Sequence, residues 1–172
     1  MDRRHTILGL LAVGPLMSSE ANAAMQSSNS DKVRQLVDRY AAAWNASDMD
    51  AMAKLYVEDV HWVNIVGMHW QGKAQVDRAH RAYFDIMFRG VPLTLETVES
   101  VVVLSEDTVV AVIRWSVGAF KTPFGEHMPP SRDRMSLVLV PKGDGLVIAH
   151  GSNVQINELA QRSDPIGQKR DS

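Results

Sequence analysis

Two histidines and a tyrosine are the residues of this sequence best placed by type to move a proton or polarise a carbonyl. The imidazole pKa of about 6.5 makes histidine the natural proton acceptor near neutral pH. The apolar stripe of a predicted helix points His80 inward, and alternation along the last predicted strand puts His150 on one face with Ile148 and Ser152. We therefore predict His80 and His150 as candidate bases and Tyr40 as a candidate donor. Each could equally be a hydrogen-bonded residue of an ordinary core.

The stretch LYVEDVHWVNIVGMHWQG, residues 55–72, carries more polar and aromatic surface than a core strand needs. Period-two alternation puts Trp62, Asn64 and Val66 on one face of this predicted strand. If the strand lined only a packed core, Val and Ile would serve without leaving polar atoms to satisfy. We interpret the stretch as one wall of a ligand pocket, with a buried, backbone-bonded Asn64 as the alternative. Further aromatic candidates, whose flat area suits a ligand or an ordinary core, are Trp44, Phe84 and Trp115.

The composition excludes several kinds of site. The sequence has no cysteine and no H-E-x-x-H motif, so no thiol chemistry or tetrahedral zinc site is expected. It has no G-x-G-x-x-G after a predicted strand, so we expect no nicotinamide or flavin cofactor. A net charge of −2 without a run of Lys or Arg gives no footprint for nucleic acid or anionic lipid. The expected partners are a small apolar or aromatic molecule and another subunit.

The first 23 residues are typical of a secretory signal peptide. Arg3 and Arg4 precede an apolar run at 7–17, and Ala21-Asn22-Ala23 matches a cleavage site. The run is much shorter than the roughly 20 residues that cross a bilayer, so a membrane anchor is the less favoured alternative. We predict cleavage after Ala23, an exported (periplasmic or secreted) protein and no remaining membrane span.

The remaining pattern predicts one α+β domain. Residues 24–30 read as a polar linker, 31–157 as the domain and 158–172 as a polar tail. Predicted helices begin at Ser30, at a Ser47/Asp50 capping box and at Lys73, the last ending at Phe88. Strands with β-branched runs follow at 93–104, 108–117, 134–140 and 146–156, and a longer loop or bulged hairpin is predicted at 118–130. Helices first and antiparallel strands afterwards indicate an α+β order.

The segments AWNASD, VNIVGMHWQGK, AHRAYF and LVLV…GDGLVIAH occur in that order along the chain. In this pattern the sequence resembles the SgcJ/EcaC group of SnoaL-like proteins, within the NTF2-like superfamily, over residues 31–157. The resemblance implies a cone in which three N-terminal helices pack on a strongly curved antiparallel sheet. It also implies a pocket inside the cone, with Trp62 and Asn64 facing it, and a homodimer formed through the sheet.

Ketosteroid isomerase, a member of the same superfamily, uses an Asp as base and a Tyr with a protonated Asp to hold the enolate. Under the resemblance its Tyr falls on Tyr40, its basic Asp on Asn64 and its second Asp on Leu137. An amide cannot take up a proton near neutral pH, so isomerisation by that mechanism is not expected.

Three functions fit these observations. The first is an exported domain that binds a small, largely apolar ligand in the cone. The second is a weak isomerase, cyclase or hydratase, with His80 or His150 as base and Tyr40 or Asn64 as donor. The third is a dimerising module whose cone is filled by its own side chains. A cavity of about 300 Å³ or more would separate the first two from the third.

Overall fold

The computed structural model describes residues 19–166 of the chain, and within them one curved sheet packs on helices. The sheet has the strand order β2-β1-β8-β7-β4-β3, in which β1 and β8 are parallel and every other neighbouring pair is antiparallel. Its strands are β1 (Tyr56–Val63), β2 (His69–Gln71), β3 (Leu93–Ser105), β4 (Thr108–Val117), β7 (Ser131–Lys142) and β8 (Gly145–Gln155). This is the α+β class that the sequence predicts.

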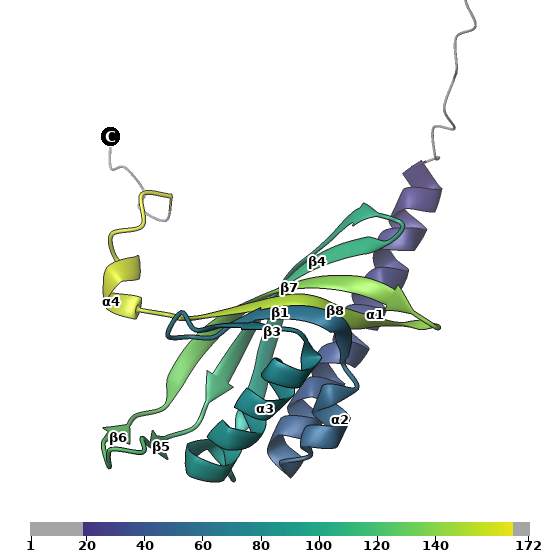
Figure 1. Ribbon diagram of the computed structural model, residues 1–172. Helices are drawn as coiled ribbons and strands as arrows, with labels where there is room; N and C mark the ends of the chain where they lie inside the picture. The colour runs from purple at the N-terminus through teal and green to yellow at the C-terminus, as the bar shows by residue number, and fades with distance from the viewer. Residues whose placement is uncertain (1–18, 167–172) are drawn as a thin grey trace, which may run out of the picture.

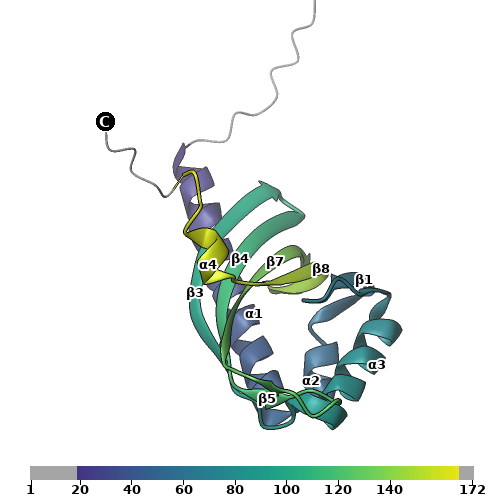
Figure 2. The ribbon, with the colours of Figure 1, turned by 90° about the vertical axis from the view of Figure 1, so that its left-hand side faces the viewer.

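The main helices lie on the concave side of the sheet, as Figures 1 and 2 show. They are α1 (Ser19–Ala46), α2 (Met49–Ala53) and α3 (Lys73–Tyr83), which continues as the π-helical turn η1 (Phe84–Phe88). A small hairpin of β5 (Phe120–Lys121) and β6 (His127–Met128) lies beside the lower end of α3 in Figure 1 and contacts η1, and a single turn of helix, α4 (Glu158–Gln161), follows β8. The predicted three helices, long strands and 118–130 hairpin are therefore all present.

The core lies between the helices and the sheet. On β4 the residues from Val109 to Val117 alternate between buried and half-buried, so one face packs inward. The inward residues of β7 are Met135, Leu137 and Leu139, which are buried in the same core cluster as the apolar residues of α1. Burial of both surfaces holds the helices over the sheet.

The first helix is longer than its sequence predicts. Residues 24–30, which the sequence predicts to be a polar linker, are part of the helix, and Ser30 is not the N-cap. Its hydroxyl donates to the Gln26 carbonyl one turn earlier (2.9 Å), and Gln26 Nε2 donates to the Val101 carbonyl of β3 (2.6 Å). Contact with β3 thus overrides the low helix propensity of this serine-rich segment. Most of the predicted signal peptide, residues 1–18, lies outside the described residues, and Ala21 to Ala23 fall within α1.

The second helix begins one residue later than predicted. Its N-cap is Asp48, whose carboxylate accepts from the Ala51 backbone N–H (2.9 Å). Ser47, the predicted cap, has a φ of 54° and forms the turn between α1 and α2 instead. Asp competes well with Ser for a cap position because its carboxylate is a strong acceptor near the helix N-terminus.

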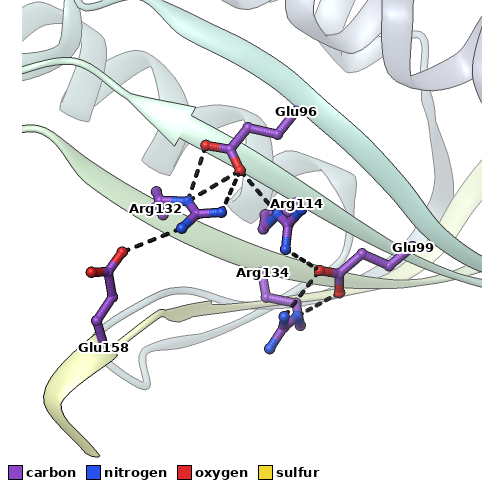
Figure 3. Close-up of polar contacts among 6 residues, drawn as sticks. All are labelled: Glu96, Glu99, Arg114, Arg132, Arg134 and Glu158. Carbon is purple, nitrogen blue, oxygen red and sulfur yellow. Dashed lines mark hydrogen bonds and ion pairs between the residues drawn. The ribbon is translucent and has the colours of Figure 1, made fainter. Parts of the chain in front are cut away.

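The outer face of the sheet carries a ladder of ion pairs (Figure 3). Arg114 of β4 joins Glu96 (2.9 Å) and Glu99 (3.1 Å) of β3, which in turn pair with Arg132 and Arg134 of β7. The hydrogen bond from Arg132 is the main cause that lowers the pKa of Glu96, and Arg134 does the same for Glu99. These arginines therefore meet carboxylates across the strands and do not face the concave side.

Candidate functional site

A cavity of about 440 Å³ lies between the helices and the concave face of the sheet. It is walled by α1, α3 and η1 on one side and by β1, β4, β7 and β8 on the other, with the β5–β6 hairpin at its rim. The volume exceeds the roughly 300 Å³ at which ligand pockets begin. The cone is therefore not filled by its own side chains, which argues against a purely structural module.

The wall of the cavity is mainly aromatic. Tyr40 stacks on Trp62 with 6.3 Å between ring centroids and 7° between the planes, and it tilts against Trp115 at 6.0 Å. All four tryptophans of the sequence line the cavity. The aromatic lining residues are Tyr40, Trp44, Trp62, Trp70, Tyr83, Phe84, Phe88, Trp115, Phe120 and Phe124. Such a wall suits a flat, apolar ligand.

His80 of α3 lines the cavity and is almost completely buried. Its Nδ1 donates to the Val76 carbonyl one turn earlier (2.8 Å). Burial lowers the pKa of His80, and so the ring is neutral at pH 7. Because Nδ1 holds the proton, Nε2 carries the lone pair and can accept a hydrogen bond or a proton.

Tyr40 of α1 also lines the cavity, where it is buried. Burial raises the pKa of Tyr40, and the nearby Tyr56 hydroxyl offsets only part of this effect. The phenol therefore stays protonated at any physiological pH. It can donate a hydrogen bond but cannot act as a base.

Three further polar groups lie on the sheet wall of the cavity: Trp115, Asp133 and Asn153, which we call the polar patch. Asp133 of β7 is directly opposite Trp115 of β4, and Asn153 of β8 is opposite Met135, the next inward residue of β7. Ser131 Oγ donates to Asp133 Oδ1 (3.2 Å), yet burial raises the pKa of this carboxyl. Trp115 Nε1 and Asn153 Oδ1 are buried without a hydrogen-bond partner among residues 19–166.

Residues 37–150 match the family model of the SnoaL-like domain. The chain belongs to this family. The match covers most of the helices and strands that wall the cavity, so the SnoaL-like domain includes Tyr40, His80 and most of the polar patch. None of the curated proteins that were compared matches this chain.

Solved structures share the fold. An uncharacterised protein with a cystatin-like fold from Caulobacter vibrioides is 31% identical, with a TM-score of 0.75 over 80% of this chain and 96% of that one. A ketosteroid isomerase-like protein from Erwinia carotovora atroseptica is 18% identical (TM-score 0.63, 74% and 95% covered). An NTF2-like superfamily protein from Salmonella enterica is 16% identical (TM-score 0.65, 83% and 98% covered). This SnoaL-like domain thus has the NTF2-like fold.

Seven of the eight site residues that the sequence predicts line the cavity of this SnoaL-like domain. They are Tyr40, Trp44, Trp62, Asn64, His80, Phe84 and Trp115. Trp62 is only 1% exposed, and it faces the cavity as predicted. Leu137, which the resemblance matches to the second acid of ketosteroid isomerase, is buried in the apolar core.

Asn64 lines the cavity but does not extend the strand. The segment 55–72 is a hairpin of β1 and β2, in which Trp62 is opposite Trp70. Asn64 Oδ1 accepts from the backbone N–H groups of Val66 (3.1 Å) and Met68 (2.8 Å) and so closes the turn. The amide oxygen is therefore occupied by backbone donors, as in the alternative that the sequence left open, but the side chain is half-buried and not buried.

His150 does not line the cavity, and its predicted face is wrong. The register pairs Ile148 with Leu139 but His150 with Val138, so Ala149 is an extra residue in β8. This β-bulge reverses the alternation, and Ile148 and Gly151 face inward while His150 faces outward beside His61. His150 is thus removed from the candidate bases of the cavity.

The sequence reasoning missed Asp133 and Asn153. A signal for Asp133 exists, because it lies two residues before Met135 and four before Leu137, on the same strand face as both. A charged residue on an otherwise apolar face indicates either a surface end of the strand or a site. The sequence gives no such signal for Asn153, because the bulge at Ala149 changes which residues of β8 face the cavity.

The described part of the chain shows no group of three or more His, Cys, Asp or Glu residues that could hold a metal ion. Within the same residues, no helix has the length and apolar character needed to span a membrane.

Proposed function

We propose that this SnoaL-like domain binds a small, largely apolar molecule in its cavity. The observation that carries the proposal is the unfilled, aromatic-walled space of about 440 Å³. An open cavity exposes apolar surface that a ligand would remove from water, at about 25 cal/mol per Å². The polar groups along its wall are few, which is typical of sites that orient an apolar ligand.

The four tryptophans make this proposal directly measurable, because all of them line the cavity. We expect a flat hydrocarbon probe, 2-methylnaphthalene, to bind with micromolar or tighter affinity in calorimetry and to change the tryptophan emission. Val117→Phe fills the cavity and should greatly weaken binding. Val102→Phe is the matched control, because Val102 is 48% exposed and does not line the cavity. Equal binding by both variants would contradict the cavity as the site.

Acid–base catalysis in the same cavity is a second candidate function. The supporting observation is that a neutral imidazole, His80, and a carboxyl of raised pKa, Asp133, line the same cavity. Groups whose environments shift their pKa values are frequent in active sites. With His150 outside the cavity, His80 is the remaining histidine base for an isomerase, cyclase or hydratase, and Tyr40 is its candidate hydrogen-bond donor.

Turnover would distinguish catalysis from binding. Small cyclic carbonyl compounds should be screened with the wild type and with His80→Gln and Asp133→Asn. Loss of turnover in either variant, with affinity retained, supports an enzyme. Affinity without turnover in the wild type supports a carrier.

We also propose that the protein is exported, belongs to the SgcJ/EcaC group and forms a homodimer through the outer face of its sheet. The supporting features are the signal-like residues 1–23, the ordered segments that resemble this group, and valines such as Val112 and Val138 on the outer face. Native mass spectrometry of the protein recovered from its producing cells tests the export and the dimer. We expect a dimer whose subunits begin after Ala23.

A further inference from the structure

The charged residues of the described chain that line the cavity are both acidic. They are Asp133 of β7 and Glu126 in the turn between β5 and β6, and the described lining includes neither a lysine nor an arginine. The histidine of the lining, His80, is neutral at pH 7 because burial lowers its pKa. The cavity therefore presents negative charge that no positive side chain of its described lining offsets.

Asp133, the acidic residue on the sheet wall, lies without a counterion. Its Oδ1 accepts from the Ser131 hydroxyl (3.2 Å), but the side chain forms no ion pair among residues 19–166. The arginines on either side of it in the sequence, Arg132 and Arg134, pair instead with carboxylates of β3 on the outer face (Figure 3). Burial raises the pKa of Asp133, because the ionised carboxyl loses contact with water. A cation placed beside it would stabilise the ionised form.

The Asp133 carboxyl differs from the other two members of the polar patch in its accessibility. Trp115 Nε1 and Asn153 Oδ1 are fully buried, so a ligand in the cavity cannot reach either atom. Asp133 is half-buried, and neither of its carboxyl oxygens is among the buried atoms that lack a partner in the described chain. Within the polar patch, Asp133 is thus the residue that offers a charge to a ligand.

Aromatic rings with exposed surface line the same cavity. Phe88 is half-buried, and its ring centroid lies 4.9 Å from that of Phe120 and 5.3 Å from that of Trp44, which are half-buried as well. Trp70 and Tyr83 are also half-buried and line the cavity, with 5.9 Å between their ring centroids. The faces of such rings attract cations, and groups of aromatic side chains bind quaternary ammonium ligands in this way.

These features favour a cation over an anion or a neutral molecule. A carboxylate or sulfonate placed near Asp133 would meet a like charge in a poorly solvated space. A neutral molecule would leave the carboxylate without a counterion. An ammonium group gains from both the carboxylate and the ring faces, and N-methyl groups give it an apolar surface that packs on the wall.

We propose that the ligand is a lipophilic cation, in which a tertiary or quaternary ammonium group binds beside Asp133 and an apolar or aromatic body packs on the aromatic wall. This inference rests on the proposed binding function and specifies its ligand class. It places the charged contact on β7, at a residue whose arginine neighbours are turned to the opposite face of the sheet.

Three naphthalenes of similar size but different charge test the ligand class. They are the cation (2-naphthylmethyl)trimethylammonium, its neutral carbon isostere 2-neopentylnaphthalene and the anion 2-naphthylmethanesulfonate. We expect the cation to bind at least about 10-fold tighter than the anion at pH 8, where the carboxylate form of Asp133 is favoured. Calorimetry gives the affinities.

Asp133→Asn removes the negative charge and nearly keeps the size of the side chain. It should weaken binding of the cation about 10-fold and change binding of the neutral isostere by less than about 2-fold. Asp107→Asn is the matched control, because Asp107 is exposed in the turn between β3 and β4 and does not line the cavity. It changes the net charge of the protein equally and should leave all three affinities unchanged. Burial disfavours the ionised carboxyl of Asp133, so Asp133→Asn is expected to fold.

The outcomes separate the ligand class from the binding function. If the anion binds as tightly as the cation, or if Asp133→Asn weakens binding of the cation no more than Asp107→Asn does, the ligand class is wrong while the binding function stands. The same holds if the cation does not bind but the neutral isostere or 2-methylnaphthalene does. If none of these compounds binds, the proposed function fails and the ligand class fails with it.

Discussion

The indole ring of Trp62 lies directly against Gly151, its cross-strand neighbour on β8. A Cβ atom added at Gly151 would collide with the ring atoms Cζ3 and Cε3 of Trp62. The close approach of a glycine backbone lets the buried indole lie flat against the sheet and stack with Tyr40. This pair therefore shapes the aromatic wall of the cavity.

Gly151→Ala should push the Trp62 ring from its place. We expect a loss of about 1–3 kcal/mol in the free energy of unfolding, as for overpacked cores, together with weaker binding of an apolar probe. Urea denaturation followed by circular dichroism measures the stability. Gly145→Ala is the control on the same strand, because its added Cβ would meet nothing closer than 3.8 Å. Equal effects of both substitutions would show that the contact with Trp62 is unimportant.

The fold could be predicted from the sequence because its strongest signals are periodic. The 3.6-residue stripe from Lys73 to Phe88 corresponds to α3 and η1, and the run TVVAVIRWSV corresponds to β4 residue for residue. Turn residues such as Gly143 separate the strands at the expected places, and Gly143 has the positive φ (58°) that a tight turn requires.

The parts that could not be predicted depend on tertiary contacts. No local sequence pattern predicts the β-bulge at Ala149. This one bulge puts His150 on the opposite face of β8 from the one expected. The contact of Gln26 with Val101 extends α1 through a segment that reads as a linker. The unpartnered Trp115 N–H is a property of three-dimensional packing and has no counterpart in the sequence.

Asn64 should matter for stability through its turn rather than through a ligand. Its Oδ1 accepts two backbone hydrogen bonds, so Asn64→Ala is expected to cost about 1–2 kcal/mol. Asn64→Asp keeps an acceptor oxygen and should cost clearly less. Thermal unfolding of both variants measures the difference. If Asp is as damaging as Ala, the two turn hydrogen bonds do not account for the role of this residue.

His80 should make the protein less stable in mild acid. Burial lowers its pKa in the folded state, so the unfolded chain binds the proton more readily. The free energy of unfolding must then fall as the pH drops below the unfolded value of about 6.5, and must recover above it. We expect His80→Gln to show a weaker loss of stability between pH 7 and pH 5 than the wild type. Denaturant midpoints across this range provide the measurement.

Asp133 provides the contrast for this experiment. Burial raises its pKa, and so its contribution to the free energy of unfolding falls as the pH rises, which is opposite to that of His80. The stability that the protonated carboxyl of Asp133 provides is lost as the pH rises through the pKa that this group has in the folded protein. Asp133→Asn should therefore gain stability relative to the wild type at neutral pH and lose that advantage in acid. An unchanged pH profile in His80→Gln would mean that other groups cause the acid sensitivity.

Phe124 should slow the escape of a bound ligand. It lies in the turn between β5 and β6 and is 92% exposed, yet it lines the cavity. A ligand that reaches the rim would cover part of this ring, and burial of even part of a phenyl group contributes about 1 kcal/mol. We expect Phe124→Ser to release 2-methylnaphthalene about 3- to 10-fold faster in stopped-flow fluorescence, with little change in folding stability. Phe124 has no buried contacts to lose, and so a large fall in stability with unchanged release would show that it supports the hairpin rather than the ligand.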